Sequence, residues 1–184
     1  MLASPLKRGF FVTIDVAGFA GSYYEITAVE GFTYVTGEET TAYFSTVASG
    51  SESGFKNIEV LEPSDSPPRL FYLVFGVKDL AKYYVKIPSG SDRFGTDEDK
   101  DIGYIDAQIS PYFEPNEDFA FWLVQDYYPS INCKNVTPVT ITPKIWFYGY
   151  KYDIQKVTSA ETIAKLKSGI IPHTEVTLGG VKEK

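Results

Sequence analysis

The 184-residue sequence contains little cysteine and little histidine: Cys133 and His173 are the only residues of their kinds. One cysteine cannot form an intrachain disulfide, so nothing in the sequence indicates maturation in an oxidising compartment. A structural zinc site usually takes four Cys and His ligands, and this chain offers two. Catalysis of the Ser-His-Asp or Cys-His kind would depend on His173, and no Gly-x-Ser-x-Gly motif accompanies it. These shortages predict a protein that is not an enzyme.

Positive charge is also scarce, with 17 Lys and Arg against 24 Asp and Glu, which gives a net charge of -7. Nucleic-acid binding depends on clustered Lys and Arg, so we expect no nucleic-acid partner. No apolar run approaches the roughly 18 residues that a membrane helix needs, so we expect no membrane insertion. At the N-terminus, Lys7 and Arg8 precede an apolar stretch, but Asp15 interrupts what a signal peptide would require. The sequence predicts a soluble chain.

Aromatic residues are abundant, at 16% of the chain with 14 Tyr and 13 Phe. Large and β-branched side chains suit the pleated, half-buried surface of a strand. Runs of such residues, separated by Gly, Pro, Ser and Asp, predict about eleven short strands, more than one open sheet usually holds. The predicted strands are Gly9–Val16, Tyr23–Val29, Phe32–Thr36, Ala42–Val47, Ile58–Leu61, Leu70–Val77, Tyr83–Ile87, Ile102–Gln108, Phe119–Tyr127, Val136–Ile141 and Ile145–Val157.

The fold class that these strands predict is all-β: a two-sheet β-sandwich of jelly-roll or Greek-key type, formed by residues 1–184 as one domain. The continuous apolar runs Leu70–Phe75 and Phe119–Val124 predict two central strands that are buried on both faces. Connectivity is not predicted by the sequence. Loops are expected at 48–54, 62–68 and 89–100, where Ser, Gly, Pro or charged residues gather.

One short helix is predicted near the C-terminus, over Ser159–Ser168. Thr158 and Glu161 have the spacing of a capping box, and apolar residues follow at helical intervals. Gly169 then provides a stop signal.

The acidic segment 97–101 is a candidate metal site, because Asp97, Asp99 and Asp101 alternate as calcium ligands often do. It departs from the EF-hand pattern, with Ile102 where Gly is needed and Gln108 where Glu is needed. The alternative interpretation is a solvated acidic turn, which charge runs usually form. Apart from calcium, no cofactor is expected.

Two tyrosines, Tyr150 and Tyr152, are candidate ligand or subunit contacts, because Tyr is enriched at interfaces and stacks on sugars. The alternative is that they line the core with their hydroxyls at its rim. The tripeptide Asn135-Val136-Thr137 matches the N-glycosylation sequon, which matters only if the chain is exported.

A strand-rich chain with no catalytic set suits a structural subunit of a self-assembling particle or filament, such as a viral capsid, a coat or a surface appendage. Its partners would be copies of itself or other subunits, and it would be found in a virion or extracellular assembly. The terminal segments Met1–Arg8 and Glu175–Lys184 are candidates for exchange between neighbours. A carbohydrate- or ligand-binding β-sandwich is the second hypothesis, and an enzyme that uses carboxylates alone is the third.

Overall fold

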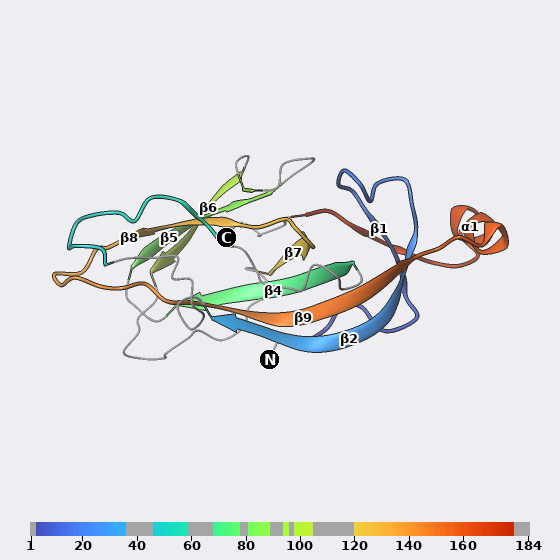
Figure 1. Ribbon diagram of the computed structural model, residues 1–184, viewed down its shortest axis with the longest axis horizontal. Helices are drawn as coiled ribbons and strands as arrows, with labels where there is room; N and C mark the ends of the chain where they lie inside the picture. The colour runs from blue at the N-terminus through green and yellow to red at the C-terminus, as the bar shows by residue number, and fades with distance from the viewer. Residues whose placement is uncertain are drawn as a thin grey trace.

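Ten strands and one helix form the regular structure of the residues that the computed structural model describes, which are 3–35, 46–58, 68–77, 81–88, 94–95, 98–104 and 120–178 (Figure 1). In chain order they are β1 (Phe11–Ile14), β2 (Tyr24–Val35), β3 (Lys56–Asn57), β4 (Arg69–Val77), β5 (Lys82–Ile87), β6 (Glu98–Tyr104), β7 (Phe121–Val124), β8 (Ser130–Lys134), β9 (Ile145–Lys156), α1 (Ala160–Lys167) and β10 (Thr174–Val176).

The strands form two sheets, one with the order β10-β1-β2-β9-β4-β7 and one with the order β3-β8-β5-β6. Within them the antiparallel pairs are nested along the chain: β2 pairs with β9, β3 with β8, β4 with β7, and β5 with β6. Nested pairing of eight strands across two sheets is the winding of a jelly roll. The predicted all-β sandwich is therefore confirmed, and its strand order is that of a jelly roll to which β1 and β10 are added.

The inner core fills the space between the two sheets. The six-stranded sheet contributes residues such as Phe71 and Phe147, and the four-stranded sheet contributes Tyr83, Val85 and Ile131. Along β5 the burial alternates strictly, so one face of that strand points into the core and the other points outward.

An outer core lies on the opposite face of the six-stranded sheet. Leu70, Tyr72 and Val74 of β4 belong to it, whereas Phe71 and Leu73 of the same strand belong to the inner core. All five side chains are buried. This confirms that β4 is a central strand buried on both faces. β7 is buried as predicted, but it pairs with β4 alone among the described strands and so lies at a sheet edge.

Segments near both termini cover the outer core. Leu6, before β1, and Leu178, after β10, are buried there together with Val16 from the turn that follows β1. The described parts of the two terminal arms, 3–8 and 175–178, therefore pack on this chain's own sheet. Their exchange with a neighbour stays a prediction.

The N-terminal half contains one long strand where two were predicted. β2 continues through Glu30 and Gly31, which pair with Lys151 and Tyr150 of β9. The prediction of a break was wrong because Gly31 stays within the ladder and pairs with Tyr150. The register of this ladder shifts earlier, at a bulge between Ile26 and Ala28.

The segment before β9 also differs from the prediction: Val136–Ile141 is not a strand, and the strand β8 lies earlier, at Ser130–Lys134. The side chain of Asn135 organises the turn between them. Its Nδ2 donates to the carbonyls of Val47 and Val139, both at 2.8 Å, and its Oδ1 accepts from Thr137. Asn135 is fully buried, so in the folded chain the sequon nitrogen is not accessible to a glycosyl donor.

Other predicted segments agree with the structure only in part. Glu98–Lys100, expected in a loop, forms the first half of β6. The predicted segment Ile102–Gln108 overlaps β6 as far as Tyr104, and its remainder lies outside the described residues, as do most of Ala42–Val47 and Ile58–Leu61.

The helix α1 is confirmed, with a different cap. Ser159 accepts a hydrogen bond from the backbone N–H of Thr162 at 3.3 Å, so the cap is one residue after Thr158. Gly169 follows the helix at φ 84°, a conformation that favours glycine at a helix end. The part of the chain that the structure describes contains no helix with the length and apolar character that a membrane crossing requires.

Gly149 in the middle of β9 has a tight environment that yields a stability prediction. A Cβ atom there would lie 2.1 Å from the carbonyl oxygen of Tyr72 on β4, and the backbone φ is 155°. Gly149→Ala should therefore lower the free energy of unfolding by about 2 kcal/mol or more, as measured by denaturant titration.

Gly31→Ala on the adjacent strand β2 is the matched control, because no atom lies within 4 Å of a Cβ built at Gly31. That variant should be neutral or stabilised by up to about 1 kcal/mol. Equal effects at the two positions would show that β9 does not approach β4 as described.

Candidate functional site

The three aspartates of the predicted calcium site are only partly within the described residues. Asp97 lies outside them. Asp99 and Asp101 lie in β6, where their backbones pair with Lys86 and Tyr84 of β5. Across the described ranges no group of three Cys, His, Asp or Glu side chains is arranged to hold a metal ion. Calcium binding by segment 97–101 stays a prediction.

The lone cysteine and the lone histidine lie in different parts of the fold. Cys133 is buried on β8, in the inner core between the sheets. His173 lies just before β10, on the other sheet, where its ring packs edge-on against Tyr23 at 5.1 Å between centroids. The structure therefore does not bring these two side chains together as a nucleophile and its base.

The sequence left two roles open for Tyr152, a ligand or subunit contact and a place in the core. The structure places its side chain in the core. Its side chain is fully buried in the outer core, and its hydroxyl lies 2.6 Å from the Ser4 hydroxyl. Burial raises its pKa from 10.0 to about 12, against the opposing effect of hydrogen bonds from Ser4 and Leu6. Tyr152 thus anchors the N-terminal segment and does not present its ring to a ligand.

Tyr150 is half-buried and lies in an aromatic group on the outer face of the six-stranded sheet. This aromatic face consists of Trp122, Tyr148 and Tyr150, all of which pack at the margin of the outer core. The register places them on one side of the sheet, because Trp122 and Tyr150 both pair with Tyr72. A ligand or subunit contact by Tyr150 stays a prediction.

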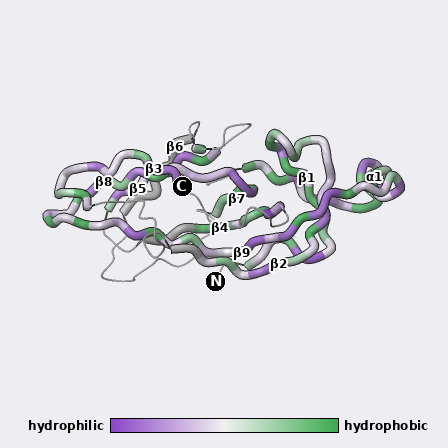
Figure 2. The backbone as a smooth tube through the Cα atoms, viewed as in Figure 1, coloured by the Kyte–Doolittle hydropathy of each residue, from purple (hydrophilic) through white to green (hydrophobic). Residues whose placement is uncertain are grey.

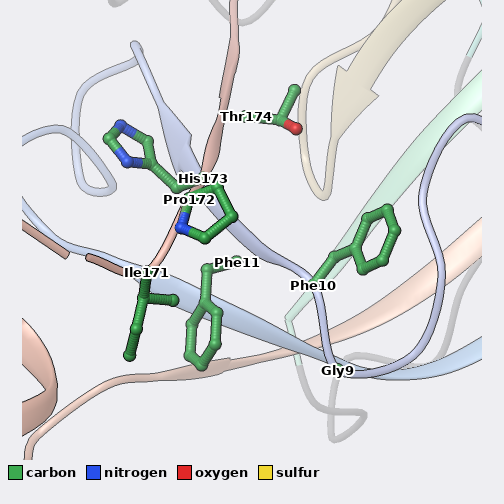
Figure 3. Close-up of a pocket in the computed structure, with 7 residues that line it drawn as sticks. All are labelled: Gly9, Phe10, Phe11, Ile171, Pro172, His173 and Thr174. Carbon is green, nitrogen blue, oxygen red and sulfur yellow. The ribbon is translucent and has the colours of Figure 1, made fainter. Parts of the chain in front are cut away.

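A small apolar pocket lies where β1 and β10 begin side by side (Figure 3). Its volume is about 250 Å³, and its wall comes from Phe10 and Phe11 on one side and from the segment 171–174 on the other. In Figure 3 the rings of Phe10 and Phe11 and the side chains of Ile171 and Pro172 surround it. The wall offers mainly apolar contacts to a bound group, and His173 is the only titratable side chain among its lining residues.

The sequence does not predict this pocket. The pattern that could have indicated it is a pair of short apolar runs, Phe10–Val12 and Ile170–Pro172, of which the second follows a helix stop. What the pattern could not show is that a parallel pairing of β1 with β10 brings the two runs together.

Comparisons with known proteins add no relative: the chain matches no protein-family model, no curated protein and no solved structure.

The hydroxyl of Tyr152 yields a prediction for pH. An ionisable group whose pKa is raised on folding stabilises the native state below its unfolded pKa, and that stability is lost as pH rises toward the folded pKa. Wild-type protein should therefore lose stability between about pH 10 and pH 12. In Tyr152→Phe this alkaline loss should be smaller, and the free energy of unfolding at pH 7 should fall by about 1 kcal/mol.

Ser4→Ala serves as the companion variant, since it removes the hydroxyl partner and keeps the tyrosine. Ser4→Ala should have a lower free energy of unfolding at pH 7 than wild type, and it should still lose stability between pH 10 and pH 12. Urea titrations at several pH values measure both effects. If wild type and Tyr152→Phe lost the same stability between pH 10 and pH 12, the burial assigned to Tyr152 would be contradicted.

Proposed function

We propose that this chain is a non-enzymatic structural subunit of a self-assembling particle or filament, of the capsid, coat or surface-appendage kind. The observation that carries the proposal is the eight-strand jelly-roll order of β2 to β9. Jelly rolls serve as capsid subunits and as lectin domains. The fold is therefore compatible with an assembly subunit and with a carbohydrate-binding domain, and it does not decide between these two functions.

The character of the surface supports the first of these uses. The described residues include an apolar pocket and the half-buried aromatic face, both of which suit contact with another macromolecule. The pocket wall contains no carboxylate, lysine or arginine beside His173, so the described wall offers this imidazole no second charged group with which to share acid-base chemistry. The partners in this proposal are copies of the chain or other subunits, within a virion or extracellular assembly.

Purified protein provides the direct test. Sedimentation velocity over a hundredfold range of concentration, together with negative-stain electron microscopy, should show a concentration-dependent rise in mass and regular shells, tubes or sheets. A protein that stays monomeric at every concentration, with and without added calcium, would refute the proposal.

A carbohydrate-binding role is the second candidate, and the aromatic face is the observation that favours it. Sugars bind by stacking on aromatic rings, and the half-buried side chains of Trp122, Tyr148 and Tyr150 share one side of the six-stranded sheet. The burial of Tyr152 removes it from this group.

The glycan hypothesis predicts that wild-type protein binds soluble β-linked oligosaccharides in calorimetry and that Tyr150→Ala lowers the affinity at least tenfold. Tyr152→Phe is the control, because its ring stays in the outer core and its affinity should stay within threefold of wild type. Absence of binding to glucan, xylan and mannan oligosaccharides, with correct folding shown by circular dichroism, would exclude this role for the sugars used.

A further inference from the structure

Asn135 joins two loops at the end of the molecule opposite α1. One loop, 47–53, precedes β3, and the other, 135–141, follows β8. In Figure 1 and in Figure 2 this end lies where β8 is connected to β9, far from the helix. The backbone N–H of Asn135 donates to the carbonyl of Ser51, and its carbonyl accepts from the backbone N–H of Gly50, at 2.9 Å each.

The side-chain amide of Asn135 is also fully used. Its Nδ2 donates to the carbonyls of Val47 and Val139, at 2.8 Å each, so both amide hydrogens have an acceptor. Its Oδ1 accepts from the backbone N–H of Thr137 at 2.9 Å and from the hydroxyl of the same residue at 2.6 Å. The residue is 0% exposed. Its amide therefore has no free hydrogen and no face that is open to solvent.

The tripeptide Asn135-Val136-Thr137 is the one N-glycosylation sequon in the sequence, and a glycosylated sequon belongs to a surface loop. Glycosylation forms a bond from Nδ2 to C1 of a sugar. The bond from C1 to the diphosphate of a lipid-linked donor breaks, the lipid diphosphate leaves, and Nδ2 loses one proton. The modified nitrogen keeps one hydrogen, so it can donate to only one of its two carbonyl acceptors.

A glycan on Nδ2 would also need space that the fold does not provide. An oligosaccharide is bulky, whereas the amide and its acceptor residue Val47 are buried, at 0% and 4% exposed. To admit a sugar the two loops would have to separate. Separation would leave the backbone groups of Asn135, Gly50 and Ser51 without the hydrogen bonds that now join them.

We infer that the folded chain exists only with an unmodified Asn135, because N-glycosylation of this residue and closure of the two loops exclude each other. The tripeptide serves here as a connection between loops, and a glycan transferred before folding would prevent the loops from closing. The inference does not depend on the proposed self-assembly. It requires that any assembly of this chain be built from subunits that fold without a glycan at this site.

Production of the full chain in a eukaryotic secretory pathway, behind an added signal peptide, tests the inference. The matched control is Lys156→Asn, which creates a second Asn-Val-Thr tripeptide at residues 156–158, on an exposed residue at the end of β9. Both tripeptides are then present in one chain. Peptide mass spectrometry measures glycan occupancy at residues 135 and 156, separately in secreted chains and in chains retained by the cell.

Circular dichroism and resistance to protease identify the folded chains in the secreted fraction. In these chains we expect occupancy at Asn135 to be at least tenfold lower than at residue 156, because the Asn135 amide is buried and bonded. Chains with a glycan on Asn135 should be found only among those retained by the cell. If Asn135 is unoccupied in both fractions while residue 156 is occupied, folding has closed the site before transfer, which also agrees with the inference.

Folded, secreted chains that carry a glycan on Asn135 at an occupancy within tenfold of that at residue 156 would overturn the inference. Should Lys156→Asn itself fail to fold, Ala160→Asn provides a second control, since it creates an Asn-Glu-Thr tripeptide on an exposed residue at the start of α1. The same comparison of occupancies then decides.

Discussion

The pairing of β9 with both β2 and β4 is the constraint on which most of the structure depends. The strand β9 pairs with β4 over Ile145–Asp153 and with β2 over Trp146–Lys156. The alternation of its side chains serves two cores: Phe147 packs between the sheets, whereas Tyr152 and Ile154 pack on the outer face. A shift of one residue in this register would exchange the two sets and expose both cores. Gly149 permits the close approach, because a side chain there would meet the backbone of β4.

The outer core explains why segments near the termini are ordered on the domain. A jelly roll needs one apolar layer, between its sheets, and here a second layer on the other face of the six-stranded sheet is covered by residues such as Leu6 and Leu178. The Ser4–Tyr152 hydrogen bond fixes the first of these segments. The strand β10 pairs in parallel with β1, which fixes the other segment and brings the two walls of the apolar pocket together.

The sequence predicted those elements whose burial or ends are indicated by a local pattern of residues. The apolar run of β4, the alternation in β5 and the helix with its Gly169 stop all carry local signals, and each was located within a residue or two. It failed where polar residues are buried: Ser130 and Asn132 of β8 are 4% and 5% exposed, and hydrogen bonds to Asn57 and Glu52 satisfy them. It also left the role of Tyr152 open, because only the N-terminal segment, far away in the sequence, decides that this ring is covered.

Hydrogen–deuterium exchange on the purified protein tests the central claim, that the pairing of β9 with β2 and β4 holds the jelly roll together. We expect the β9 amides to exchange slowly, as slowly as any amides of the described chain. Fast exchange along β9 would contradict the claim.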